Sequence, residues 1–177
     1  FPTVQIAEPV GWAADEAPKP AAGLAVNRFA EGLDHPCTLY TLPNGDVLVS
    51  LTRAPRMEQA PSGIMDRIKG WVASYLFAKA GSAGSSANQI VLLRDTDGDG
   101  AADKRTVLLE DGLDSPSGLA WRDDTLYVAN HNAVLAFDYA LGGDKVTSTP
   151  RKLMDLAPGG GHWMRNLALH PTDDLLY

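Results

Sequence analysis

The densest group of acidic residues lies in Asp95-Thr-Asp-Gly-Asp-Gly-Ala-Ala-Asp103. The four aspartates match positions 1, 3, 5 and 9 of a calcium loop. Gly100 matches position 6, and the Ala101 carbonyl is available at position 7. Carboxylates this close repel one another unless a cation neutralises them, and an all-oxygen ligand set selects Ca²⁺ or Mg²⁺. We therefore predict a structural calcium ion here, the alternative being an Asp/Gly turn without metal. The predicted ligands are Asp95, Asp97, Asp99, Ala101 and Asp103.

This acidic loop is not an EF-hand. Position 12 is Thr106 rather than the bidentate glutamate, and the flanking segments Gln89–Leu93 and Thr106–Leu109 are apolar and β-branched. The pattern predicts a hairpin whose long turn carries the aspartates.

A second candidate site is Pro158-Gly-Gly-Gly-His-Trp-Met-Arg-Asn166. Three consecutive glycines let the backbone approach another group closely or adopt positive φ. His162 can act as a general base near neutral pH, Trp163 can stack on a planar ring, and Arg165 can pair with a carboxylate. By residue type alone, a histidine satisfied within a loop is the simpler interpretation.

The sequence lacks the motifs of several other classes of enzyme. It contains no Gly-x-Ser-x-Gly elbow, no phosphate-binding Gly-x-x-x-x-Gly-Lys-Ser/Thr loop, no His-Glu-x-x-His and no Cys-x-x-Cys. A net charge of −7 argues against nucleic acid, and the absence of any run of 18 apolar residues argues against a membrane span. Cys37 is the sole cysteine, so no intrachain disulfide forms.

The elements that must position these residues recur along the chain. Glu31-Gly-Leu-Asp-His-Pro36 precedes an apolar segment, an Asn-Gly turn and the apolar run Val47–Leu51. Asp111-Gly-Leu-Asp-Ser-Pro116, 80 residues later, precedes an apolar segment, the polar turn Arg122–Asp124 and the apolar run Leu126–Ala129, and a third copy begins at Asn166–Leu169. The alternative is chance similarity between ordinary strand–turn–strand hairpins.

The spacing of these copies can be reconciled. Leu119 to Leu167 is 48 residues, and Leu39 to Leu119 is 80, but the first interval contains an insertion of about 35 residues. A period of about 40–50 residues with several short strands is typical of β-propeller blades. We therefore predict an all-β fold with about two and a half blades of an expected six. Within it, His131 at a strand end is a candidate to face the propeller axis.

The insertion, at about residues 54–88, has a helical period. Ile64, Ile68, Trp71, Val72, Tyr75 and Leu76 recur three and four residues apart, which predicts an amphipathic helix of about four turns. Such a helix can be a lid or a docking surface, or it can simply cover the propeller. Residues 1–25, with four prolines, predict an extended arm, and the propeller domain is predicted over residues 26–177.

Four segments taken in order resemble the glucose/sorbosone dehydrogenase family. They are Leu42–Val49, the Ile68-Lys-Gly-Trp-Val72 helix, Ser86–Gly100 and Gly159–Leu167. Members of this family are soluble, pyrroloquinoline quinone (PQQ) dependent quinoproteins built on a six-bladed β-propeller. The resemblance covers about residues 26–177.

The resemblance implies a periplasmic enzyme that oxidises an aldose or sugar aldehyde and passes electrons to an acceptor. His162 matches the family's general base, which takes the substrate's hydroxyl proton while hydride moves to PQQ. Trp163, Arg165 and Asn166 are then candidate cofactor contacts. In the family, the remaining PQQ contacts and the cofactor's own calcium come from later blades, so the Asp95 loop would hold a separate, structural ion.

Two other functions stay open at this point. Six-bladed propellers also serve as calcium-dependent lactonases, and others are non-catalytic binding domains. Because a propeller needs at least four blades to protect its edges, we expect the 177 residues to be the opening part of a longer chain and inactive alone.

Overall fold

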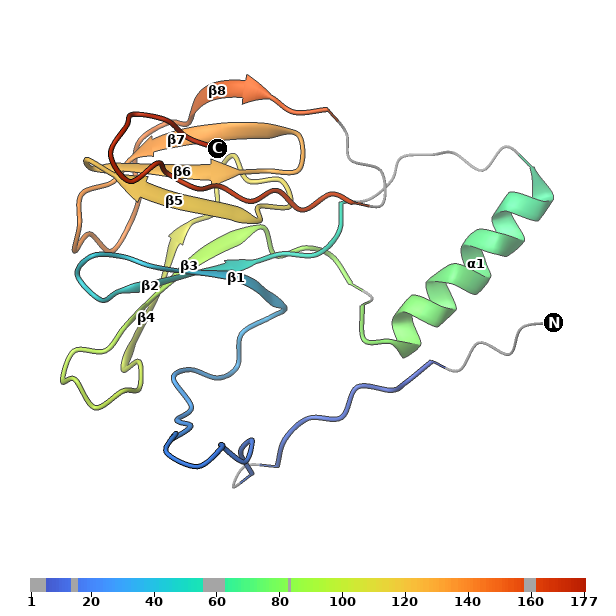
Figure 1. Cartoon of the computed structure of the whole chain (residues 1–177). Helices are drawn as coiled ribbons and strands as arrows, with labels where there is room; N and C mark the ends of the chain where they lie inside the picture. Colours follow the sequence, from blue (N-terminus) through green and yellow to red (C-terminus); the bar gives the residue numbers. More distant parts are fainter. Residues whose placement is uncertain (1–5, 14–15, 56–62, 83, 158–161) are drawn as a thin grey trace. The chain divides into compact units, whose positions relative to one another are not determined.

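The protein is described by a computed structural model, and its described residues are 6–13, 16–55, 63–82, 84–157 and 162–177 (Figure 1). Residues 1–26 and 56–85 form one compact unit, and residues 27–55 and 86–177 form a second. The eight strands assigned among the described residues all lie in the second unit, which is therefore mostly β. The expectation of an all-β fold is confirmed to the extent that the second unit is mostly β.

The first sheet of the second unit contains four antiparallel strands that neighbour one another in chain order. Its strands are β1 (Pro36–Thr41), β2 (Val47–Leu51), β3 (Gln89–Arg94) and β4 (Lys104–Leu109). The predicted strand over Val47–Leu51 is confirmed, and the predicted hairpin around the acidic loop is the β3–β4 pair.

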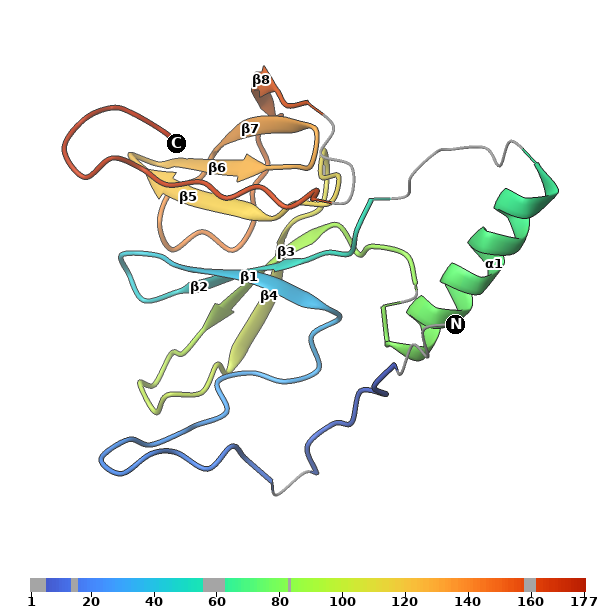
Figure 2. The ribbon, with the colours of Figure 1, turned by 45° about the vertical axis from the view of Figure 1, so that its right-hand side comes forward.

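The second sheet repeats this arrangement in residues 118–155 (Figure 2). Its strands are β5 (Gly118–Arg122), β6 (Thr125–Ala129), β7 (Ala133–Asp138) and β8 (Arg151–Asp155). Successive strands pair antiparallel, as in the first sheet. The β6–β7 connection is short, whereas the corresponding β2–β3 connection holds the long insertion, which explains the unequal spacing of the sequence copies.

The central strands of the first sheet, β2 and β3, are buried on both faces. Leu48 pairs with Leu92 and joins a core shared with the second sheet, while Val49 pairs with Val91 and faces the opposite side. Burial on both faces requires continuous apolar strands rather than alternating ones, and Ile90–Leu93 is such a run.

The shared core joins the two sheets face to face. It contains residues from β2, β3 and β4 of the first sheet together with residues from β5, β6 and β7 of the second. Phe137 is the largest of its completely buried side chains. Tyr40 adds a polar link, since its hydroxyl accepts a hydrogen bond from the Trp121 amide at 3.1 Å. The sheets therefore stack as two layers within one unit.

Residues 162–169 run beside β5, as both views show (Figures 1 and 2). Leu169 forms an antiparallel bridge with Leu176, so the predicted third strand–turn–strand copy is a short hairpin. Gly118 of β5 permits the close approach, because a Cβ at this position would lie 2.7 Å from the Arg165 carbonyl oxygen and 3.0 Å from Leu167. β1 in turn contacts β5. The first strands of successive repeats are therefore neighbours.

The first unit contains helix α1 (Ile64–Lys79), which confirms the predicted helical insertion. The helix ends in a Schellman motif, in which the Ser82 amide donates to the Phe77 carbonyl and the Gly81 amide to the Ala78 carbonyl. Gly81 takes the required positive φ of 74°. No residue of α1 is buried among the described residues. The described residues of the predicted arm contain no helix or strand.

Candidate functional site

The connections that precede β1 and β5 share one backbone turn. Gly32 and Gly112 both adopt positive φ, at 67° and 76°, and so do His35 and Ser115, at 54° and 46°. Positive φ is uncommon for residues other than glycine, so its recurrence 80 residues apart is not a generic hairpin property. The repeated Gly-Leu-Asp-x-Pro sequence therefore reflects a repeated structure.

Each of these turns presents an aspartate that accepts a hydrogen bond from the end of the neighbouring strand. Asp34 accepts from Arg53 Nη2 at 2.9 Å, and Asp114 accepts from Asn132 Nδ2 at 3.2 Å. Thr38 and Gly118 occupy equivalent positions in the two repeats, and they pair with Ser50 and Ala129 of the neighbouring strands. The two donors each lie three residues beyond these partners, so they are equivalent as well. The sequence alone did not reveal these pairs, although the repeated aspartate was a signal for them.

His131 belongs to the second of these clusters. Its Nδ1 lies 3.4 Å from a carboxylate oxygen of Asp114 and 3.3 Å from the Asp114 carbonyl oxygen. The imidazole is about four-fifths buried, with 20% of the side chain exposed. This residue therefore holds the turn before β5 together.

His162 occupies the corresponding position of the third copy, because it precedes Leu167 by five residues as Asp114 precedes Leu119. Its side chain is exposed, and no hydrogen bond of the imidazole is found among the described residues. Trp163 is half-buried and Asn166 is exposed. The glycines predicted to allow close approach, Gly159–Gly161, lie outside the described residues.

Arg165 is anchored by the backbone around it. Its Nη2 donates to the Ala157 carbonyl at 2.7 Å and its Nη1 to the His162 carbonyl at 3.4 Å. Its Nε is buried and has no hydrogen-bond partner among the described residues. The guanidinium therefore holds the two ends of the Gly-rich segment together, and one buried N–H remains available to an acceptor.

The acidic loop lies between β3 and β4, at the end of the sheet opposite to the turn that precedes β1. Oxygen atoms of Asp95, Asp97 and Asp99 gather within 4.8 Å of one another. Asp95 accepts hydrogen bonds from the amides of Gly100 at 2.9 Å and Gly98 at 2.7 Å, and these bonds, chiefly the first, lower the pKa of Asp95. Three of the predicted carboxylate ligands are thus brought together.

The fourth predicted carboxylate has a different partner. Asp103 accepts hydrogen bonds from the Thr96 hydroxyl and from the Thr96 amide, the latter at 3.0 Å, and the hydroxyl bond is the main cause of its lowered pKa. It is not part of the three-aspartate group. The hydrogen bonds between Thr96 and Asp103 therefore join the two ends of the loop.

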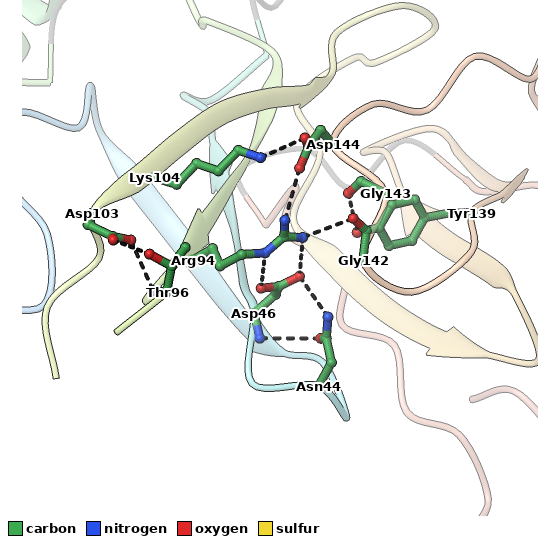
Figure 3. A network of polar contacts seen from close by, with 10 residues as sticks. All are labelled: Asn44, Asp46, Arg94, Thr96, Asp103, Lys104, Tyr139, Gly142, Gly143 and Asp144. Carbon is green, nitrogen blue, oxygen red and sulfur yellow. Dashed lines mark hydrogen bonds and ion pairs between the residues drawn. The ribbon is translucent and has the colours of Figure 1, made fainter. Parts of the chain in front are cut away.

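An ion-pair network, buried at Asp46 and exposed at Asp144, links the first sheet to the β7–β8 connection of the second (Figure 3). Arg94 donates to both carboxylate oxygens of Asp46, each at 2.7 Å, and to Asp144 at 3.0 Å. Lys104 also donates to Asp144, at 2.6 Å. Asp46 is only 3% exposed, and its pKa is lowered mainly by the hydrogen bond from Arg94. Sequence reasoning missed this network, which is structural: it anchors the β7–β8 connection to the first sheet.

Comparisons with known proteins identify one family. A family model described as "Domain of unknown function (DUF7133)" matches residues 69–159, just over half of the 177-residue chain. No curated protein and no solved structure matches the chain. Among the described residues, no helix is long and apolar enough to cross a membrane.

Proposed function

The chain belongs to the DUF7133 family, a domain of unknown function, and we propose that it forms part of a PQQ-dependent sugar dehydrogenase of the β-propeller type. The substrate class is an aldose or sugar aldehyde, the location is the periplasm, and a separate acceptor takes the electrons. The proposal joins the resemblance to the glucose/sorbosone dehydrogenases with the repeated geometry of the second unit.

The propeller proposal depends on how the repeats adjoin one another. Each sheet has four antiparallel strands in chain order, and the first strands of the two sheets are in contact. The third copy continues the series, because Arg165 lies against Gly118 of β5. Four-stranded sheets whose first strands adjoin in succession are typical of propeller blades. This arrangement is the observation that carries the proposal.

The candidate base is His162. An exposed imidazole without a hydrogen-bond partner among the described residues can accept a proton from a bound hydroxyl near neutral pH. Asp34 and Asp114, at the equivalent positions of the other copies, are engaged by Arg53 and by Asn132 and His131. Among the described residues, the third copy therefore differs from the first two in carrying a side chain without a hydrogen-bond partner at this position.

The side chains around His162 suit a planar, anionic cofactor. When bound, PQQ would supply a quinone that accepts the substrate's hydride. Trp163 offers an indole face for stacking, and the unpartnered Nε of Arg165 offers a donor to a carboxylate. The two other donating nitrogens of Arg165 hold backbone carbonyls, so its main role is to position the segment that carries His162.

We also propose that the acidic loop binds calcium through Asp95, Asp97 and Asp99. Hard carboxylate oxygens gathered within 4.8 Å fit an oxygen-preferring cation. The carbonyl of Ala101 remains a proposed ligand, whereas Asp103 is engaged by Thr96. The proposed role is structural, because the loop lies at the strand ends opposite to His162.

The test is reduction of an electron-acceptor dye by the full-length protein with PQQ, calcium and several aldoses. Dye reduction that requires both PQQ and an aldose would support the proposal. Absence of reduction with every sugar would overturn it, and hydrolysis of a lactone without PQQ would assign the propeller to the lactonases instead.

A further inference from the structure

The two faces of the first sheet pack against different kinds of structure. On one face, Leu48 and Leu92 belong to the core shared with the second sheet. The other face has a separate core of four buried side chains, which we call the outer face of the first sheet: Val49, Leu51, Val91 and Leu93. Residues 27–33 cover this outer face with three half-buried apolar side chains, Phe29, Ala30 and Leu33.

The second repeat shows what this type of face packs against. Val49 pairs with Leu39, and Val128 pairs with the equivalent Leu119, so Val49 and Val128 occupy equivalent positions. Val128 lies in the shared core, which means that the second sheet uses this face to pack on the sheet before it. Among the described residues no strand precedes β1. Residues 27–33 therefore occupy the place that a preceding sheet would take.

Residues 27–33 are attached to the β3–β4 hairpin through their backbone. The Ala102 amide donates to the Phe29 carbonyl at 2.8 Å, and Arg105 Nη1 donates to the Gly32 carbonyl at 3.0 Å. The segment contains no helix or strand, so no ladder of hydrogen bonds holds it. Segments with few buried contacts open locally at a lower free energy than the sheets they cover. The outer face can therefore be uncovered while both sheets stay folded.

The side of the segment that points away from the sheet is polar. Asn27, Arg28 and Glu31 are exposed, and Arg28 pairs with Glu31 at 2.9 Å. In arrays of stacked repeats, the end elements need a polar outer side because an open apolar face associates with other molecules. Residues 27–33 have this two-sided composition.

We propose that residues 27–33 are a cap that takes the place of a preceding sheet and blocks the docking of a second copy on the outer face. The outer face is built to pack against another sheet of the same kind, and a second copy supplies one. Two uncovered faces can stack as sheets do in sandwiches, in a closed two-fold dimer. This inference does not depend on the proposed dehydrogenase activity or on calcium.

The first experiment removes the cap and measures self-association by sedimentation velocity. Phe29→Ser with Leu33→Ser removes the two largest apolar contacts of the cap. We expect self-association at least about tenfold tighter than in wild type, with increased fluorescence of an apolar dye at low protein concentration. Arg28→Ser with Glu31→Ser is the matched control, because it changes two residues of the same segment on its polar side and should leave both readouts at wild-type values.

A further substitution identifies the surface that associates. Val47 is half-buried at the border of the outer face. Adding Val47→Lys to the uncapped variant places a charge in the proposed interface, so the dimer should be lost. Circular dichroism verifies that each variant keeps its β structure.

The second experiment measures opening of the cap without altering its apolar side chains. Arg105→Ala removes the hydrogen bond to the Gly32 carbonyl and changes an exposed side chain. We expect amide exchange at Ala102 to become at least about tenfold faster, because its partner is the Phe29 carbonyl. The Asp103 amide donates to the Arg94 carbonyl within the hairpin, so its exchange should not change.

Three results would overturn the proposal. The first is a folded uncapped variant that stays as monomeric as wild type. The second is equal association of the uncapped variant and its matched control, or association that Val47→Lys does not reduce. The third is unchanged exchange at Ala102 in Arg105→Ala, which would show that the segment does not open separately from the sheet and would apply even if the uncapped variant failed to fold.

Discussion

Ser117 and Arg165 form two hydrogen bonds across the junction between β5 and the third repeat. The Arg165 amide donates to Ser117 Oγ at 2.7 Å, and the same hydroxyl donates to the Arg165 carbonyl at 3.0 Å. Ser117 is completely buried, so both bonds are shielded from water. These two residues are 48 positions apart, which equals the repeat length. One serine thus fixes the register between successive repeats.

The first prediction concerns the close packing at this junction. Gly118→Ala places a methyl group 2.7 Å from the Arg165 carbonyl oxygen and should displace residues 165–169 from β5. We expect a loss of about 1–3 kcal/mol in unfolding free energy and faster amide exchange at Ala168 and Tyr177. Gly70→Ala is the control, because no atom lies within 4 Å of the added Cβ there. Unchanged exchange in Gly118→Ala would contradict the packing described here.

The second prediction concerns the pH dependence of the buried ion pair. Asp46→Asn should lower the unfolding free energy by about 2–3 kcal/mol at pH 7, because it leaves Arg94 without its bidentate partner. The folded-state pKa of Asp46 is lowered, so its contribution is full above the ordinary carboxyl pKa and is lost as pH falls through the lowered value. Urea unfolding at pH 7 and pH 3 measures this. A difference between wild type and variant that does not shrink in acid would refute the assignment.

The third prediction tests the shared core. Leu92→Ala removes a completely buried side chain between the sheets and should cost about 2–5 kcal/mol. Leu39→Ala alters a leucine that is 65% exposed on β1 and should cost less than about 1 kcal/mol. Chemical denaturation of both variants makes the comparison, and equal losses would show that the sheets do not share the described core.

The fourth prediction tests the acidic loop. Calcium should raise the melting temperature of the wild-type protein, and a chelator should reverse the rise. Asp97→Asn with Asp99→Asn should abolish this response, because both carboxylates belong to the three-aspartate group. Asp123→Asn, in the exposed β5–β6 turn, should leave the response intact. A wild-type melting temperature that is insensitive to both calcium and chelator would show that the loop is an Asp/Gly turn without metal.

Local patterns predicted much of the fold. The apolar runs that became β2 and β3 and the three- and four-residue period of α1 require no knowledge of distant contacts. The Asp46–Arg94 pair could not be predicted, because its members are 48 residues apart and each has an ordinary local context. For the same reason the partners of Asp34 and Asp114 appeared only once the strands were paired.

The candidate site was predicted by residue type rather than by arrangement. Four aspartates in nine residues suggested one ligand set, but Thr96 engages Asp103 and leaves three together. His162 was singled out by its motif, and the structure adds that its side chain is exposed and that Arg165 holds its backbone carbonyl. Its role as a base stays a prediction.

The central claim is that the full-length protein oxidises sugars with PQQ through His162. The direct measurement is the rate of aldose-dependent dye reduction after addition of PQQ and calcium, for wild type, His162→Asn and His170→Asn. We expect activity in wild type, a loss of at least about 100-fold in His162→Asn, and little change in His170→Asn, which lies in the turn of the third hairpin. Absence of wild-type activity, or equal activity in all three proteins, would contradict the account.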